Sequence, residues 1–177
     1  MSSSDRRTRR ALLLALGLAP TLMLGGCFRP MYATPSDGGP ALNERLSAIA
    51  VEAATERVEQ QVRNALTFGL TGGGAPAQPK YLLHMSVTSS ATSGIVDSRA
   101  NTPEIDTVVV TCSYGLTAIG DPQVLLLSGK AYGRKSYDRG LQRFAALRAQ
   151  RDAENDAAVL VADQLKTRLA IFLADHP

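Results

Sequence analysis

The C-terminal stretch, residues 141–173, constrains the fold most, because it contains neither Gly nor Pro and is rich in Ala, Leu, Arg, Gln and Glu. These residues favour one helix of roughly 30 residues, about 45–50 Å long. Its second half carries an apolar stripe formed by Ala158, Val161, Leu165, Leu169 and Phe172. The first half is more charged, and the pattern leaves open whether it is solvated or lies on another surface.

The preceding residues alternate between helix and strand signals. Residues 47–51 form a short strand candidate, and a helix is expected from about Thr55, a plausible N-cap, to the glycines at 72–74. One apolar stripe runs along this helix, made of Val58, Val62, Ala65, Leu66 and Leu70.

Alternating apolar and polar residues then predict strands at 81–88 and 108–118. The small polar residues from Ser89 to Pro103 predict a long loop between them. Gly120-Asp121-Pro122 predicts a turn, so that residues 123–132 fold back antiparallel. The expected fold class is α+β: a small mixed or antiparallel sheet of about four strands, with two helices on one face, in the order β-α-β-β-β-α.

The N-terminal residues 1–26 have the pattern of an export signal. Four arginines precede an apolar run of 14 residues, Ala11 to Leu24, whereas a membrane-spanning helix needs about 20. The arginines at 9 and 10 also resemble a twin-arginine motif, so the sequence does not decide between the general secretory route and the twin-arginine route.

The segment ends in Leu24-Gly25-Gly26-Cys27, which resembles the bacterial lipobox. We expect cleavage before Cys27, an S-diacylglycerol thioether on its sulfur and an acyl chain on its amine. Two or three acyl chains hold a protein stably on a membrane. A soluble secreted protein cut near the same place is the alternative. Phe28, in place of an Asp, favours the outer membrane.

The mature chain divides into a lipidated tether, residues 27–43, which is rich in Pro and Gly, and one α+β periplasmic domain, residues 44–177. The net charge of +3 belongs to the signal, because residues 27–177 hold 15 basic and 15 acidic side chains. A nucleic-acid partner that relies on bulk positive charge is therefore not expected.

No motif in the sequence indicates an enzyme. Gly129-Lys130 lacks the flanking residues of a phosphate loop, and no Gly-x-Ser-x-Gly sequence is present. Two histidines make a multi-histidine metal site improbable, and Cys112 is expected to be an inert buried thiol. We expect no catalytic residues, no metal and no cofactor other than the covalent lipid.

One stretch suggests a binding role. Within ten residues lie four cations and two aromatic residues: Lys130, Tyr132, Arg134, Lys135, Tyr137 and Arg139. Ammonium and guanidinium groups bind phosphate, so Lys130, Arg134, Lys135 and Arg139 are candidate contacts for a phosphorylated lipid. An ordinary solvent face, or a polar rim against a protein partner, explains the same residues.

The sequence after the lipobox, Phe28-Arg29-Pro30-Met31-Tyr32-Ala33, resembles the mature N-terminus of the lipopolysaccharide-assembly lipoprotein (LptE) family. The blocks Ser136-Tyr137-Asp138, Gln142-Arg143-Phe144-Ala145 and Asp152-Ala153-Glu154 resemble the C-terminal part of its alphaproteobacterial members, as do residues 163–170. The Gly that follows the Cys in that family is missing here, and Met31 replaces Leu.

The resemblance implies an outer-membrane lipoprotein on the periplasmic side. Such a protein plugs a β-barrel partner, helps this barrel assemble and contacts lipopolysaccharide on its way to the outer leaflet. The resemblance does not identify the residues that contact lipid. The alternatives are an auxiliary lipoprotein of another envelope lipid transporter and a stand-alone lipid-binding lipoprotein.

Overall fold

The computed structural model describes residues 41–76, 78–96, 103–140 and 142–176. They form an α+β domain with one four-stranded sheet in the order β1-β2-β3-β4. The elements are α2 (Leu42–Ser47), β1 (Ile49–Val51), α3 (Arg57–Thr71), β2 (Tyr81–Val96), β3 (Pro103–Ala118), β4 (Asp121–Asp138) and α4 (Arg143–Asp175). The expected fold class is confirmed, with α2 as an additional short helix before the first strand.

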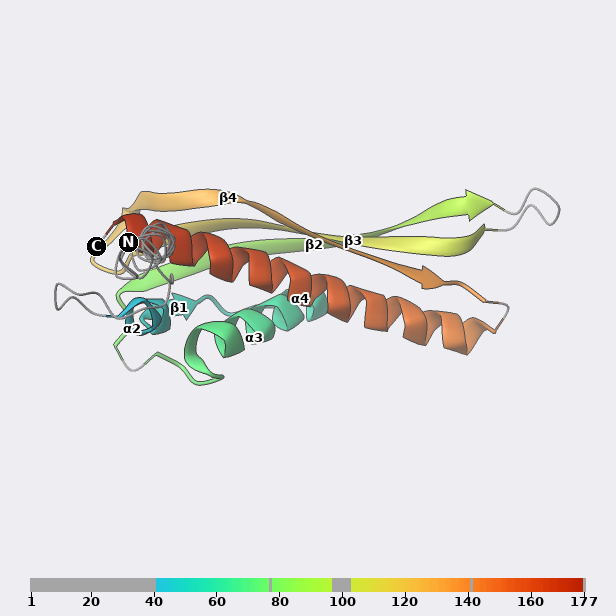
Figure 1. Cartoon of the computed structure of the whole chain (residues 1–177), viewed down its shortest axis with the longest axis horizontal. Helices are drawn as coiled ribbons and strands as arrows, with labels where there is room; N and C mark the ends of the chain where they lie inside the picture. The colour runs from blue at the N-terminus through green and yellow to red at the C-terminus, as the bar shows by residue number, and fades with distance from the viewer. Residues whose placement is uncertain (1–40, 77, 97–102, 141, 177) are drawn as a thin grey trace, which may run out of the picture. The chain divides into compact units, whose positions relative to one another are not determined.

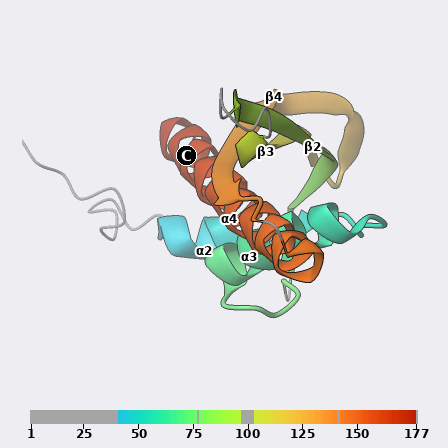
Figure 2. The ribbon, with the colours of Figure 1, turned by 90° about the vertical axis from the view of Figure 1, so that its right-hand side faces the viewer.

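The helices lie on one side of the sheet. In the end-on view of Figure 2, α2 and α3 lie below strands β2, β3 and β4, and α4 runs diagonally from beside the strands to α3. Helix α4 packs on β3 and β4, and α3 packs on β2 and on α4 (Figure 1). Strand β1 pairs parallel with β2, whereas β2, β3 and β4 form antiparallel pairs, so the sheet is mixed.

The core lies between the sheet and the helices, where both predicted helical stripes are found. Val62, Leu66 and Leu70 of α3 are buried. In α4 the buried positions of the stripe are Ala158, Val161, Leu165 and Leu169, while Phe172 is partly buried. From β3 the inward-facing residues are Val108, Val110, Cys112, Tyr114 and Leu116.

Close packing of α4 on β4 depends on one glycine. A Cβ atom at Gly133 would lie 2.0 Å from the carbonyl oxygen of Ala157 and 2.9 Å from its carbonyl carbon. The helix backbone therefore rests directly on the strand at this point. Any side chain at 133 would force the two elements apart.

Several boundaries differ from the expectations. Ser47 belongs to α2 rather than to the first strand, β3 begins at Pro103 rather than at 108, and β4 continues to Asp138 rather than ending at 132. Residues 89–96 continue β2 rather than forming a loop, because Ser89, Ser90, Ala91 and Thr92 pair with β3 residues Val110 to Thr107, which supply a β-branched partner strand. Residues 97–102 lie outside the described part. Thr55 is not the N-cap of α3. That position is Glu56, and the backbone N–H of Thr55 instead donates to Glu59 Oε2 at 3.1 Å.

Another difference concerns the tether. Helix α2 begins at Leu42, and the side chains of Leu42 and Leu46 are buried. The last two positions of the expected tether therefore lie in a helix that packs on the core. The predicted end of α3 is confirmed, because Gly72 has the left-handed conformation, φ 77°, and its N–H donates to the carbonyl of Phe68.

Candidate binding surface

The basic residues of β4 lie on two different faces of the sheet. Ala131 and Gly133 face α4 and are buried, so the alternation of the strand places Lys130, Tyr132 and Arg134 on the opposite face. All three are exposed, and Tyr132 is 52% exposed. The alternation of the sequence puts these three residues on one face if the strand continues to Arg134, and β4 does continue to Asp138.

Lys135 and Arg139 do not join this group. Lys135 points to the helix side of β4, where its Nζ lies 3.2 Å from Asp156 Oδ2 of α4. Both side chains are about half exposed, so this pair contributes little to stability. Arg139 follows the last residue of β4 and lines a groove on the helix side. The four candidate cations therefore do not form one cluster.

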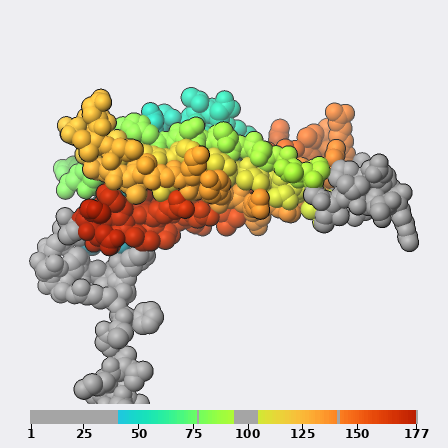
Figure 3. Space-filling view, turned by 90° about the horizontal axis from the view of Figure 1, so that it is seen from above, coloured from blue at the N-terminus to red at the C-terminus, as the bar shows by residue number. Residues whose placement is uncertain are grey.

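The face that carries Lys130 and Arg134 is mostly uncharged and polar. We call it the open face, because none of the described helices covers it. The cross-strand pairs Thr88–Thr111 and Ser86–Ser113 lie on it, and Thr107 Oγ1 and Ser136 Oγ are 2.9 Å apart. Figure 3 shows the strands, coloured green to orange, at the surface beside the red helix α4. The middle of this face is formed by Ser86, Thr88, Ser90, Thr92, Thr107, Val109, Thr111, Ser113, Lys130, Tyr132, Arg134 and Ser136, and its ends by His84, Gly115, Ser128, Ile105 and Asp138.

The outer edge of the sheet is partly protected by α4. The side-chain amide of Gln164 donates to the carbonyl of Tyr132 at 2.8 Å and accepts its N–H at 3.3 Å. Arg168 donates to the carbonyl of Lys130 and, at 3.4 Å, to the hydroxyl of Tyr114. These side chains satisfy β4 backbone groups that a neighbouring strand would otherwise bind.

A groove of about 610 Å³ lies between the far end of the sheet and the first turns of α4. Asp106 lines this groove and is only 8% exposed. Its Oδ2 accepts a hydrogen bond from the Tyr137 hydroxyl at 3.2 Å, while Oδ1 has no hydrogen-bond partner among the described residues. Burial, followed by the hydrogen bond to Asp106, raises the pKa of Tyr137. Arg139 and Arg143 also line the groove.

The sequence analysis missed Asp106 and Arg143 as parts of a groove. A signal for Asp106 existed, since it is in phase with the inward-facing Val108 and Val110 of β3. Arg143 gave no such signal, because its position beside the groove depends on the path that the chain takes between β4 and α4.

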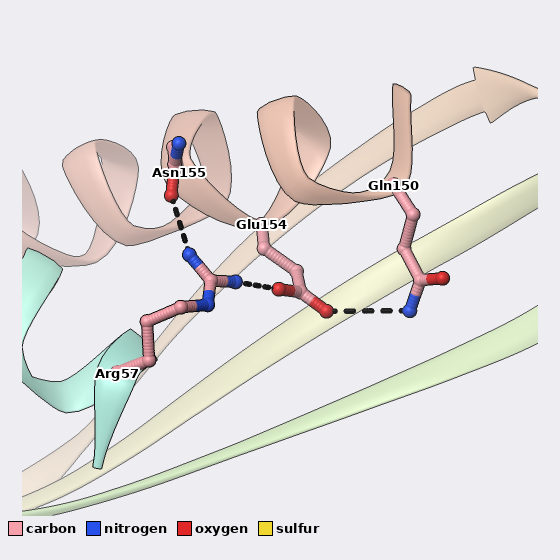
Figure 4. Close-up of polar contacts among 4 residues, drawn as sticks. All are labelled: Arg57, Gln150, Glu154 and Asn155. Carbon is pink, nitrogen blue, oxygen red and sulfur yellow. Dashed lines mark hydrogen bonds and ion pairs between the residues drawn. The ribbon is translucent and has the colours of Figure 1, made fainter. Parts of the chain in front are cut away.

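A polar cluster joins the start of α3 to the middle of α4 (Figure 4). Arg57 donates to Glu154 and, at 3.0 Å, to Asn155 Oδ1, while Gln150 Nε2 donates to Glu154 Oε1 at 3.3 Å. The side chain of Glu154 is 15% exposed. Glu154 was expected among the charged residues at the start of α4, and its burial against Arg57 shows that this half of the helix is only partly solvated.

The remaining titratable residues have structural explanations. His84 Nδ1 lies 2.9 Å from Glu52 Oε2, so this histidine is a hydrogen-bonded residue of β2. Cys112 is fully buried, and burial, followed by the charge of Glu59, raises its pKa to about 11. Asp152 and Asp156 are exposed on α4. Within the described ranges, no three His, Cys, Asp or Glu side chains are placed to hold a metal.

Cys27, the predicted lipid attachment residue, lies outside the described residues, as do the signal segment and most of the tether. Among the helices of the described part, none is both long and apolar enough to cross a membrane.

Solved structures of bacterial lipoproteins share this fold. A protein of Caulobacter crescentus CB15 assigned as a lipoprotein matches with a TM-score of 0.62 and 21% identity, over 75% of this chain and 96% of its own. Rare lipoprotein B of Shewanella oneidensis matches with a TM-score of 0.55 and 10% identity, over 72% of this chain and 95% of its own. No protein-family model matches the sequence, and no curated protein matches it significantly. At these identities the likeness establishes the fold alone.

Proposed function

We propose that this chain is an outer-membrane lipoprotein of the lipopolysaccharide-assembly type, anchored through Cys27. It plugs a β-barrel translocon, helps this barrel assemble and contacts lipopolysaccharide during insertion into the outer leaflet. In this role the domain is a non-catalytic adaptor on the periplasmic side. The lipobox and the Phe28–Ala33 segment support the proposal, and so does a fold shared with bacterial lipoproteins.

The observation that carries the proposal is the open face. A two-layer α+β protein buries one face of its sheet under helices, and here the other face of a sheet with strands of 16 to 18 residues is left uncovered by the described helices. The middle of that face is made largely of Ser and Thr and carries the cations Lys130 and Arg134, while Asp138 and Ile105 lie on the same face at its far end. The lumen of a β-barrel is polar, so a plug needs a surface of this kind.

Contact with lipopolysaccharide is assigned to Lys130 and Arg134 within this face. They are four residues apart on one strand, so their Cα atoms are separated by about 13–14 Å. Both side chains are long and lie on the same face, so their cations can converge on one phosphorylated headgroup. Lys135 has a weaker case because Asp156 already partners it. Arg139 would contact a ligand only from the groove side.

The test compares two charge-reversed proteins. The double variant Lys130→Glu/Arg134→Glu should lose most of its lipopolysaccharide binding at low salt. The matched control Arg148→Glu/Arg151→Glu makes the same charge change on exposed positions of α4 and should bind normally. Equal binding by the two variants would remove the phosphate contact and leave the plug role standing.

A second candidate function is a lipid-binding lipoprotein that acts alone or with another envelope transporter. The groove beside Asp106 favours it, since Arg139 and Arg143 line this groove and guanidinium groups bind the phosphate of a lipid headgroup. Co-purification separates the two functions: the plug should be isolated with a β-barrel, the alternative with inner-membrane transporter subunits or alone.

A further inference from the structure

Strand β2 has an unpaired edge along most of its length. Strand β1 pairs only with Tyr81 to Leu83, whereas β2 continues to Val96. Figure 1 shows β1 beside one end of β2, which continues well beyond it. Among the described residues, no other element forms a backbone hydrogen bond with residues 85–93 on the side away from β3. We call residues 85–93 the free edge.

The strand register shows which backbone groups of the free edge point outward. The carbonyl of Leu83 accepts the N–H of Glu52 at 3.0 Å, so at Leu83 the backbone groups face away from β3. In an antiparallel pair this direction alternates along the strand, and the pairing of β2 with β3 has no register shift before Ser93. The residues whose N–H and C=O groups face outward, over about 20 Å of strand, are therefore Met85, Val87, Ser89 and Ala91.

The two edges of the sheet differ in their protection. On β4, side chains of α4 bind backbone groups of Lys130 and Tyr132, and basic residues stand along the strand. The free edge of β2 contains neither a charged residue nor Pro, because residues 85–93 read Met-Ser-Val-Thr-Ser-Ser-Ala-Thr-Ser. Charges, Pro and covering side chains are the usual means by which an edge avoids pairing with another chain. The free edge is therefore suited to accept a further strand.

The side chains beside the free edge define the kind of strand that fits. Met85 and Val87 are partly buried against the core on the helix side. Ala91 lines the groove beside Asp106, which is also lined by Leu147 of α4, a side chain that is 51% exposed. The alternate residues of the edge are the Ser and Thr side chains of the open face. A fitting strand therefore alternates apolar residues on the helix side with small polar residues on the open face.

We propose that an extended segment of the β-barrel partner pairs antiparallel with the free edge, as an additional strand beyond the end of β1. The inference rests on the proposed function and adds a backbone contact to the polar contacts of the open face. An extended chain is the structure that matches a row of outward N–H and C=O groups. Strands in the wall of a closed barrel are already paired on both sides, so the segment is a loop that reaches into the lumen.

Amide hydrogen exchange tests this pairing in the native chain, measured residue by residue in the lipidated protein alone and in the complex isolated from membranes. In the protein alone, the outward amides of Val87 and Ser89 should exchange fast, whereas that of Thr88, which bonds to β3, should be protected. In the complex the two outward amides should slow by about tenfold or more. The amides of Arg134 and Ser136, which face outward on β4, are the internal control and should stay fast.

A pair of Pro variants gives a second readout. Ser89→Pro removes an outward N–H that β3 does not use, and Pro is tolerated at such a position of an edge strand. Ser136→Pro makes the same change on the other edge of the sheet. Ser89→Pro should lower the yield of the barrel complex several-fold relative to Ser136→Pro, with both thermal transitions close to that of the native chain. If either variant fails to fold, the exchange measurement decides.

A barrel complex in which the outward amides of β2 stay fast would overturn this inference and leave the proposed function intact. Equal slowing at Arg134 and Ser136 would also overturn it, because the lumen would then shield both edges without pairing. Slow exchange of the β2 amides in the protein alone would mean that this chain or a second copy covers the edge, which contradicts the inference as well. Failure to isolate any barrel complex would refute the proposed function and this inference together.

Discussion

Replacing Gly133 with Ala tests the contact on which the packing of α4 depends. The new Cβ would lie 2.0 Å from the carbonyl oxygen of Ala157, whereas a comfortable C···O contact is about 3.3 Å. The helix must therefore move away by roughly 1.3 Å, because the atom it meets belongs to the backbone and cannot rotate aside. A radial gap of 0.5–1 Å already forfeits about a quarter to a half of each contact energy.

This shift would loosen the part of the core beneath α4, where Ala157, Ala158 and Val161 are fully buried. Overpacking a core costs about 1–3 kcal/mol and occasionally more, and a backbone clash belongs at the upper end of that range. For a domain of this size a loss of about 3 kcal/mol lowers Tm by roughly 6–12 °C.

The measurement is urea unfolding followed by circular dichroism, with the thermal transition as a second readout. Gly120→Ala is the matched control, because Gly120 has open space around it and no positive φ. It should change the free energy of unfolding by less than about 0.5 kcal/mol. If Gly133→Ala is as stable as Gly120→Ala, α4 does not rest on β4 as described.

Four further predictions concern buried polar groups and the thiols. Tyr137→Phe should lower the free energy of unfolding by about 1–3 kcal/mol, because it leaves the buried Asp106 Oδ2 without its hydrogen-bond donor. The control Tyr132→Phe, on the open face, should leave the free energy of unfolding unchanged. Equal effects of the two substitutions would contradict the contact between Tyr137 and Asp106. Arg57→Gln should lower the free energy of unfolding, measured with urea, by about 1 kcal/mol, because the mostly buried Glu154 loses its cationic partner. An unchanged free energy of unfolding would contradict a stabilising role for this cluster. Burial raises the pKa of Cys112 from 9.0 to about 11, so between these values the folded state keeps a proton that the unfolded state loses. The free energy of unfolding should therefore fall from pH 9 to pH 11 in the native protein, and it should fall less in Cys112→Ala. Thiol titration in urea should then find one reactive thiol if Cys27 is a thioether and two if it is free.

Most of the fold could be predicted because its elements carry local signals. The helix over α4 follows from the lack of Gly and Pro, and β3 follows from its strict alternation. The continuation of β2 through Ser89–Val96 carried no such signal, because small polar residues suit a loop equally well. Pairing with β3 decides its structure, and that pairing depends on residues far along the chain.

The candidate surface was only partly predictable for the same reason. Strand alternation correctly placed Lys130, Tyr132 and Arg134 together. It could not show that Lys135 meets Asp156, because that contact depends on where α4 crosses β4. Likewise, the burial of Glu154 depends on the start of α3, which lies almost one hundred residues earlier in the sequence. Contacts between distant elements therefore account for what the sequence did not predict.

Isolation of the native lipoprotein from bacterial membranes in mild detergent tests the central claim most directly. The account predicts that the chain, with diacylglycerol on Cys27 by mass, is isolated in a stable 1:1 complex with an outer-membrane β-barrel. The chain found alone, with inner-membrane transporter subunits, or without lipid in the soluble fraction would contradict it.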